Sequence, residues 1–240
     1  MGGGRLLLVP NLLGVVAPDA VLPARTIETV RALRHFVAEN AKSARAFLKA
    51  IGITAPLQDI AIAELNEHTP PERIAALLAP VAEGHDLGLL SDAGCPAVAD
   101  PGGALVAAAH RAAIPVVPLV GPSSILLALM ASGLNGQGFT FHGYLPAKSE
   151  PRVAALRNVD ALARTTGATQ IFIEAPYRNV ALLQSLLTTC AADTLMAVAA
   201  DLTLATEEIA MLPVAGWRRR DVERYHNRPA IFLLGRPPLR

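Results

Sequence analysis

Short, unbroken apolar runs alternate along the chain with longer segments whose apolar positions recur at helical spacing. Arg5–Val9 shows no polar alternation, which is typical of a strand buried on both faces. Thr26–Glu39 places four apolar residues at helical intervals, so the spacing predicts one long helix there. Repeated alternation of strand and helix favours a mainly parallel α/β arrangement.

The same pattern predicts the remaining elements. Strands are expected at 59–65, 87–90, 114–120, 139–144, 170–173, 195–200 and 230–234. Helices are expected at 44–51, 103–113, 123–132, 152–165 and 180–189. These eight strands are many for one open sheet, so two sheets are expected. We therefore predict two α/β domains, residues 1–120 and 121–240, divided near the LVGPSS turn.

Composition and charge narrow the class of protein. The chain is 52% hydrophobic and 17% charged, which is enough apolar material for a buried core and excludes disorder as the dominant state. A net charge of +1 argues against binding nucleic acid through a strong overall positive field, although a local basic patch stays open. The two cysteines, Cys95 and Cys190, exclude a disulfide scaffold and a cysteine-rich metal site. A reduced, cytoplasmic location is expected.

One stretch has the length of a membrane span. Residues 112–147 contain no Asp, Glu, Lys or Arg. However, Pro115, Pro118 and Pro122 interrupt its most apolar half, and each proline removes a backbone donor. The stretch is therefore interpreted as a strand, a sharp turn and a buried helix, and no membrane association is expected.

Three loops that follow predicted strands are candidates for ligand binding, because open parallel sheets bind ligands at the carboxyl ends of their strands. These loops are Val9–Gly14, Ser91–Gly103 and Val120–Ser124, and none contains Lys or Arg. The chain also lacks a GxGxxG or GxxxxGK[ST] motif, which makes phosphate-bearing cofactors less favoured.

Carboxylates and small hydroxyls remain in these loops. Asp92 and Asp100 suit a ligand that carries hydroxyls and positive charge but no phosphate, as S-adenosylmethionine does. The alternative is that both carboxylates form turns or caps, and that Ser123 and Ser124 only cap the following helix.

Seven pieces of the sequence, in order, resemble the tetrapyrrole methylase superfamily of S-adenosylmethionine-dependent methyltransferases. They are LLLVPNLLG, LLSDAGCPAVADPG, PVVPLVGPSSILLALMASGL, FHGYLPAK, IFIEAPYR, AADLT and RPAIFLLG. The set is most similar to the branch of 16S ribosomal RNA cytidine 2′-O-methyltransferases. This resemblance implies a methyltransferase with two α/β domains, S-adenosylmethionine in the cleft between them, an RNA or ribosomal-subunit substrate and a homodimer.

Two features depart from that branch. Its members carry an acidic-Asp-Thr-Arg-His-Thr stretch after the first long helix, where residues 39–45 here are ENAKSAR. The longer C-terminal extension common in those enzymes has no counterpart, which suggests a shorter paralogous subgroup. Two alternatives therefore stay open beside RNA methylation: C-methylation of a corrin or porphyrin, and a non-catalytic module that binds the cofactor or RNA.

The resemblance assigns cofactor contacts position by position. They fall at Pro10, Leu90, Ser91, Asp92, Val98, Ser123, Ser124, Glu174, Ala175, Ala200, Pro229 and Ala230. Relatives use backbone groups at several of these positions, so side-chain identity is a weak guide to importance.

A ribose hydroxyl is a poor nucleophile, so a neighbouring base would assist methyl transfer. The catalytic candidates are Glu174, Glu39 and His142, beside Asp92. Each has a structural alternative: Glu174 could pair with Arg178 or cap a helix, His142 could be a satisfied strand residue, and Glu39 could lie on a solvated helix face.

Substrate contacts are expected from four basic residues: Lys42, Arg45, Lys148 and Arg178. The arginines within Arg218–Arg228 could steer RNA phosphates or tetrapyrrole carboxylates, or form a solvated face. Few aromatic side chains are available to stack on bases, and the best placed are Trp217, Tyr225, Tyr144 and Tyr177.

Overall fold

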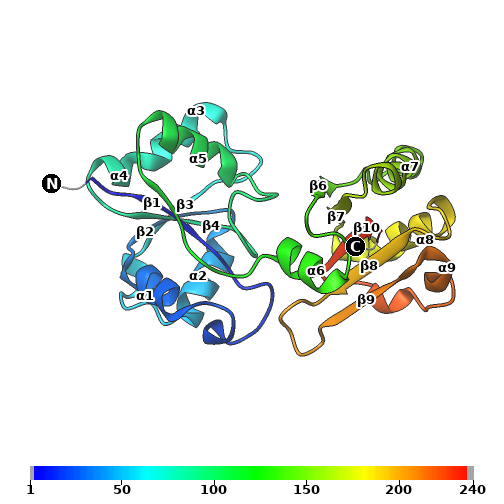
Figure 1. The fold of residues 1–240 in the computed structure, drawn as a ribbon. Coiled ribbons are helices and arrows are strands. Elements are labelled where there is room, and N and C mark those ends of the chain that lie inside the picture. The colour runs from blue at the N-terminus through cyan, green and yellow to red at the C-terminus, as the bar shows by residue number, and fades with distance from the viewer. Residues whose placement is uncertain (1–2, 237–240) are drawn as a thin grey trace. The chain divides into compact units, whose positions relative to one another are not determined.

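The computed structural model describes residues 3–236, and the chain divides into two compact units, Met1–Ser123 and Ser124–Arg240 (Figure 1). The predicted boundary after residue 120 lies three residues before this division. Each unit contains its own five-stranded sheet with helices packed on it. The prediction of two α/β domains built on two sheets is therefore confirmed.

The sheet of the first unit is parallel throughout, with strand order β3-β2-β4-β1-β5. Its strands are β1 (Leu6–Val9), β2 (His35–Ala38), β3 (Ala61–Glu64), β4 (Leu87–Leu90) and β5 (Val116–Pro118). Because all five strands run the same way, the loops that follow them meet at one edge. β4 lies at the centre and is buried along its whole length.

Helices cover both faces of this sheet (Figure 1). They are α1 (Ala24–Ala32), α2 (Ala41–Ala50), α3 (Pro71–Ile74), α4 (Ala79–Ala82) and α5 (Gly102–Arg111). One apolar cluster joins α1 and α2 to the sheet, and a second joins α4 and α5 to it. Gly88 on β4 permits this packing, because a Cβ there would stand 2.7 Å from the ring of Phe36.

The predicted helix over Thr26–Glu39 is wrong in its second half. The chain leaves the helical conformation at Leu33 (ψ 155°), and β2 follows. The guanidinium of Arg34 closes α1 by donating to three carbonyl oxygens, including that of Leu33 at 2.9 Å. Val37 is buried on β2, which lies between β3 and β4. An apolar residue at this position fits a helix and a buried strand equally well.

The sheet of the second unit has strand order β6-β7-β10-β8-β9. Its strands are β6 (Phe139–Tyr144), β7 (Thr169–Ile173), β8 (Leu195–Ala200), β9 (Glu208–Pro213) and β10 (Ala230–Gly235). β6 and β7 are parallel, whereas the other three pairings are antiparallel. The expectation of a mainly parallel arrangement is therefore wrong for this sheet, because β8 and β9 form a hairpin without a crossover helix.

The pattern analysis also missed β9. This strand lies at the edge of the sheet, is mostly half-buried, and ends in Pro213. An edge strand tolerates proline and needs no continuous apolar run, so its sequence carries little of the usual strand signal.

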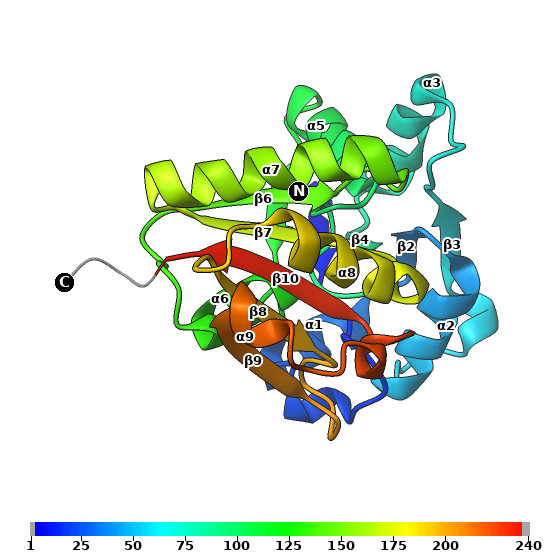
Figure 2. The same ribbon diagram turned by 90° about the vertical axis from the view of Figure 1, so that its right-hand side faces the viewer.

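The helices of the second unit are α6 (Ser124–Ser132), α7 (Ser149–Thr166), α8 (Asn179–Thr189) and α9 (Val214–Trp217). α7 and α8 lie side by side over the sheet (Figure 2) and enclose a core that includes Phe172, Phe232 and Trp217. α6 packs against β8, β9 and β10. Within residues 3–236, no helix combines the length and apolarity that a membrane crossing requires.

Candidate functional site

Asn11 ties together two of the loops at the carboxyl edge of the first sheet. Its backbone exchanges hydrogen bonds with Gly94, at 2.8 and 3.2 Å. Its buried side-chain amide donates to the carbonyl oxygens of Ser91 (2.9 Å) and Asp92 (3.1 Å). The loop after β4 is thereby fixed on the loop after β1. The sequence analysis did not single out Asn11, although an asparagine directly after a buried strand is a signal for such a turn.

Replacing Asn11 with alanine is expected to lower the free energy of unfolding by about 1–3 kcal/mol, because buried backbone acceptors would lose their donor. Denaturant unfolding measures the change. Asn66→Ala is the matched control, since the Asn66 side chain accepts one exposed hydrogen bond from His68. Equal stability of Asn11→Ala and the wild-type chain would contradict the role given to the amide.

Residues 39–45, where the sequence departs from the branch it resembles, lie at this same edge. Asn40 caps α2, and its Oδ1 accepts hydrogen bonds from the backbone N–H of Lys42 (2.8 Å) and Ser43 (3.3 Å). The Ser43 hydroxyl donates to the carboxylate of Asp92. Lys42 and Arg45 are exposed on α2. Residues 39–45 therefore hold Asp92 in place, a role that the sequence analysis did not assign to Ser43.

Glu39, at the end of β2, carries a carboxyl group in an acidic environment. Its pKa is raised above the ordinary value, first by burial and then by the negative charges of Asp92, Asp100 and Glu67. A hydrogen bond from the backbone N–H of Asp92 opposes this shift in part. A carboxylate with a raised pKa is a stronger base, and the surrounding acidic groups favour a cation over an anion.

Asp100 forms the turn that the sequence suggested as its alternative role. Its carboxylate accepts hydrogen bonds from the backbone N–H of Ala97 (2.8 and 3.0 Å) and Gly102 (2.7 Å). Ala97 and Ala99 have positive φ angles of 65° and 60°, which L side chains rarely adopt. The carboxylate stabilises this strained loop, and Val98 at its tip is 47% exposed.

The loop after β5 is joined to the loop after β4 through Cys95. The thiol donates to the carbonyl oxygen of Pro122 at 3.5 Å and shares a hydrogen bond with Ser123. Burial raises the pKa of this thiol, so it is a poor nucleophile. Ser124 is the first residue of α6. The predicted cofactor residues Pro10 and Leu90 are both buried at the ends of β1 and β4.

The predicted cofactor residues of the second unit also gather at one edge of their sheet. Antiparallel pairing sets Ile231 opposite Ile173, so the start of β10 adjoins Glu174 and Ala175. Ala230 pairs with Ala200 on β8, and Asp201 N–H donates to the carbonyl oxygen of Pro229 at 2.9 Å. The strand register therefore brings together five positions from three distant segments.

Glu174 is the most enclosed charged group at this edge, with 4% of its surface exposed. Its Oε1 accepts hydrogen bonds from the backbone N–H of Ala175 (2.8 Å) and from Arg178 Nε (2.8 Å) and Nη2 (2.6 Å). Its Oε2 is buried and has no partner among the described residues, and the same holds for Asn179 Oδ1 and Thr203 Oγ1. Such atoms are costly unless a ligand or water satisfies them.

The basic residues expected to contact substrate differ in their surroundings. Arg178 pairs with Glu174, and its guanidinium lies 5.2 Å from the ring centroid of Tyr177. Lys148 is exposed at the position before α7. Tyr144 and Tyr177 are 58% and 64% exposed and can still meet a planar ligand.

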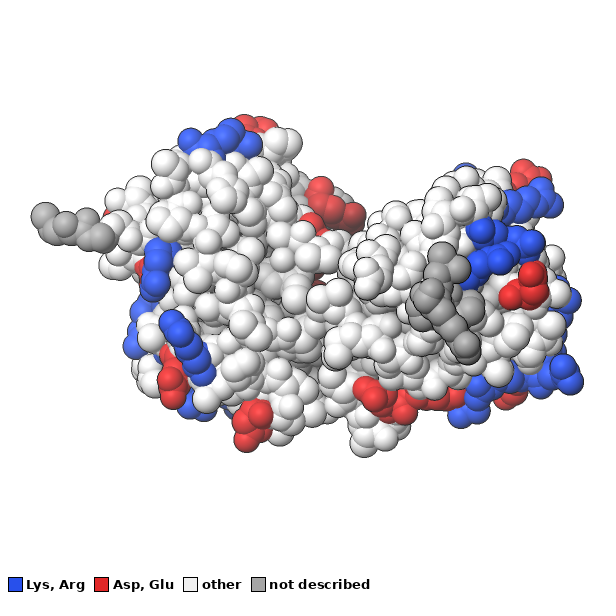
Figure 3. Space-filling model, viewed as in Figure 1, with Lys and Arg blue, Asp and Glu red and all other residues white. Residues whose placement is uncertain are grey.

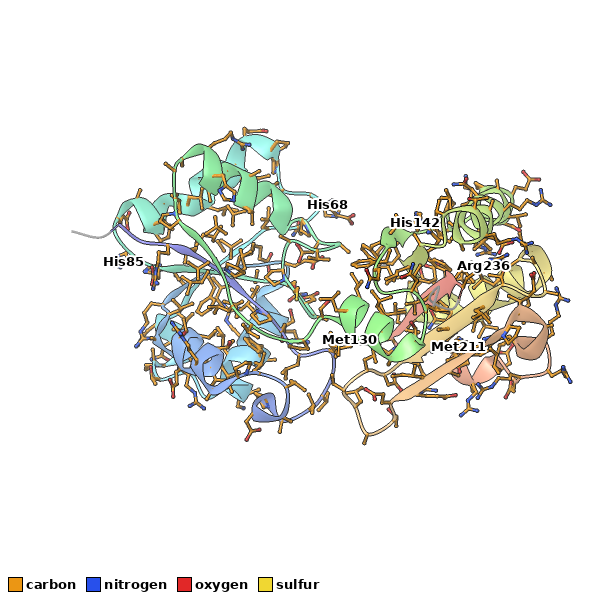
Figure 4. All side chains as sticks on the ribbon, viewed as in Figure 1. His68, His85, Met130, His142, Met211 and Arg236 are labelled. Atoms are coloured by element: carbon orange, nitrogen blue, oxygen red, sulfur yellow. The ribbon has the colours of Figure 1, made fainter. Side chains whose placement is uncertain are left out.

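His142 lies apart from Glu174. Its Nε2 forms a 2.8 Å hydrogen bond with Gln170 Oε1, and Figure 4 shows it on β6. Gln170 lies on β7 and Glu174 directly follows that strand, four residues further on, which corresponds to roughly 13 Å of extended chain. The geometry favours the structural interpretation of His142.

The arginines of 218–228 mostly belong to an ion-pair network. Glu208 pairs with Arg224 (3.1 Å), Arg228 (3.0 Å) and Arg220 (3.5 Å), and Arg228 also pairs with Asp201 (2.8 Å). Figure 3 accordingly shows acidic side chains among the basic ones on the second unit. Because three of these arginines are paired with carboxylates, the segment offers less unpaired positive charge to RNA phosphates than its sequence suggested.

The prediction that Trp217 and Tyr225 stack on RNA bases is wrong. Trp217 and Tyr225 are fully buried in the core of the second unit. Trp217 Nε1 donates to the carbonyl oxygen of Met196 at 2.7 Å. Burial, together with the neighbouring Glu208 carboxylate, raises the pKa of Tyr225 to about 12. Large rings next to a run of arginines can thus belong to the core, with the guanidinium groups of Arg220 and Arg228 lying over them.

The first unit thus has strand-end loops free of lysine and arginine, and the second has, at one edge of its sheet, buried acceptors without partners among the described residues. A family profile described as Tetrapyrrole (Corrin/Porphyrin) Methylases matches residues 18–215. The chain belongs to this family and is a methyltransferase.

Named relatives and solved structures extend this result. Ribosomal RNA small subunit methyltransferase I of Escherichia coli O157:H7 is 32% identical over 235 residues, which are 97% of this chain and 78% of that protein. The protein of the same name from Micromonospora olivasterospora is 38% identical over 185 residues, 77% of this chain and 55% of that protein.

Among solved structures, the methyltransferase CobJ matches with a TM-score of 0.65 at 18% identity, covering 99% of this chain and 96% of that chain. Uroporphyrin-III-C-methyltransferase from Thermus thermophilus matches with a TM-score of 0.55 at 20% identity, covering 97% of this chain and 92% of that chain. At these identities the two structures establish the shared fold alone.

Proposed function

We propose that the chain transfers a methyl group from S-adenosylmethionine to a ribose 2′-hydroxyl of small-subunit ribosomal RNA. The observation that carries this assignment is the 32% identity to the Escherichia coli ribosomal RNA enzyme over 97% of the chain. The methyltransferase CobJ and the uroporphyrin-III-C-methyltransferase are only 18% and 20% identical, although they cover the chain equally well. An RNA substrate of this kind would also place the protein in the cytoplasm.

The donor and acceptor chemistry of the two units supports S-adenosylmethionine as the cofactor. This molecule offers hydrogen-bond donors from its adenine amino group, ribose hydroxyls and ammonium group, and it has no phosphate. The unpartnered acceptors Glu174 Oε2 and Asn179 Oδ1 match such donors, and the Thr203 hydroxyl can accept one as well. The acidic loop edge around Asp92 suits a cation. When bound, the cofactor supplies an activated methyl group on its sulfonium.

We assign the role of base to Glu39 and a cofactor-binding role to Glu174. Glu39 combines a raised pKa with a position at the loop edge of the first sheet, so its carboxylate can take the proton that the ribose hydroxyl loses. Glu174 is already engaged by Arg178 through Oε1, which leaves Oε2 as an acceptor for the cofactor. The exposed side chains of Lys42 and Arg45, just beyond Glu39, are placed to hold RNA phosphates.

Mass spectrometry of 16S ribosomal RNA nucleosides from cells that lack the protein tests the proposal. We expect one 2′-O-methylcytidine to disappear and to return with the wild-type chain but not with Glu39→Gln. Unchanged RNA, together with methylation of a precorrin or uroporphyrin by the purified protein, would replace RNA with a tetrapyrrole as substrate. Unchanged RNA with bound cofactor and no turnover would instead indicate a binding module.

The resemblance to the family further supports a homodimer. We expect analytical ultracentrifugation at micromolar concentration to show a species of twice the 25.1 kDa chain mass. A species of the chain mass alone would reject this part of the proposal.

A further inference from the structure

A cavity of about 520 Å³ opens in the first unit at the sheet edge opposite the strand-end loops. It lies where β1, β2 and β4 begin, and its charged or titratable lining consists of Arg5, Arg34, His35, His85 and Asp86. None of these residues contributes to the loop edge described above. Figure 4 shows His85 and His68 on opposite sides of the unit.

The lining carries a positive charge that no carboxylate balances. Arg5 and Asp86 neutralise each other through hydrogen bonds of 3.2 Å (Nε–Oδ1) and 2.6 Å (Nη2–Oδ2). Arg34 forms no ion pair among the described residues, because its guanidinium faces the carbonyl oxygens at the end of α1 and the Thr54 hydroxyl. The cavity is therefore positive before any charge on its histidines is counted.

Two histidines complete the lining. The rings of His35 and His85 stack with centroids 4.8 Å apart and planes inclined by 27°. Within residues 3–236 neither ring forms a hydrogen bond or an ion pair, so the nitrogens of both rings keep their hydrogen-bonding capacity. Gly84 also lines the cavity, and its φ of +92° is one that L side chains rarely adopt.

We propose that this cavity binds a phosphate group. Guanidinium groups and imidazole N–H groups donate hydrogen bonds to phosphate oxygens, and the stacked rings present such donors in the same cavity as the guanidinium of Arg34. The volume accommodates a small phosphate-bearing molecule or one nucleotide of an RNA chain. The site does not depend on the proposed methyl transfer, because it lies at the other edge of the sheet.

Imidazole NMR spectra of the histidine-labelled full chain test the site, with inorganic phosphate as the probe and potassium chloride at matched ionic strength as the reference. We expect the signals of His35 and His85 to shift and that of His68, which is exposed and pairs only with Glu67, to stay. His85→Asn should weaken the phosphate response of His35 by about tenfold, through loss of one imidazole hydrogen bond to the anion. His68→Asn is the matched control.

Absence of shifts at His35 and His85, or an unchanged response in His85→Asn, would overturn the proposal. A short single-stranded RNA then identifies the source of the phosphate. Shifts of the same two signals at lower RNA than phosphate concentration would assign the site to an RNA backbone. Shifts with inorganic phosphate alone would assign it to a small molecule. Folding of each variant is checked by the remaining histidine signals, so a collapsed variant is recognised.

Discussion

Replacing Glu39 with glutamine is expected to slow methyl transfer by roughly 10²- to 10⁴-fold, the usual contribution of a general base. Glutamine keeps the shape of the side chain but cannot accept the proton of the ribose hydroxyl. Single-turnover transfer of labelled methyl to small ribosomal subunits measures the rate. Cofactor affinity, measured by calorimetry, should stay the same. The matched control is Glu72→Gln, an exposed carboxylate on α3.

The pH dependence of the rate separates a base from a merely structural carboxylate. The wild-type rate should rise with pH as Glu39 loses its proton. Because the negative charge of Asp92 helps to raise the pKa of Glu39, Asp92→Asn should lower that pKa and move the rise to lower pH. Glu39 is rejected as the base if the rate of Asp92→Asn rises at the same pH as that of the wild type. It is also rejected if Glu39→Gln transfers methyl at a rate close to that of the wild type.

The Glu39→Gln variant is expected to lose activity without losing stability. A raised pKa means that the folded state disfavours the ionised carboxyl group, so its contribution becomes unfavourable as pH rises from the ordinary value of 4.5 through the folded value. Glu39→Gln should therefore unfold at the same or a higher temperature than the wild type at neutral pH. The difference should vanish in acid, where both states of the wild type are protonated. Such a trade between stability and activity is common at functional sites.

Glu174→Gln is expected to weaken S-adenosylmethionine binding by about 100-fold, within the range for altering one partner of a buried charged hydrogen bond. The amide offers one oxygen where the carboxylate offers two, and Arg178 already occupies Oε1. Calorimetric titration with the cofactor measures the dissociation constant, and thermal unfolding shows whether the variant is folded.

Arg178→Ala is the matched control for this prediction. It removes the ion pair but leaves both oxygens of Glu174 in place, so cofactor affinity should fall less than in Glu174→Gln. The Michaelis constant for RNA should rise instead, since Arg178 is also a proposed substrate contact. If both variants weaken the cofactor equally, Glu174 acts only by holding Arg178. If neither changes the affinity, the cofactor does not contact this carboxylate.

The failure to predict β2 and the shape of the second sheet have a common physical cause. The apolar spacing of Thr26–Glu39 fits both a helix and a strand, and the segment of β9 carries little strand signal of its own. What decides between them is pairing with strands distant in the sequence, such as that of β2 with β3 and β4. Local spacing contains no information about those partners.

The sequence by itself determined the two α/β domains, the loops without lysine or arginine, and the family, because turn residues and short ordered motifs are local properties of the chain. Only the tertiary structure decided which side chains at those loops act together. It joined Asn11 to Ser91, held Asp92 with Ser43, and left one oxygen of Glu174 unpartnered. It also took Trp217 and Tyr225 into the core. Burial and charge at a site arise from neighbours far apart in the sequence, and folding alone brings them together.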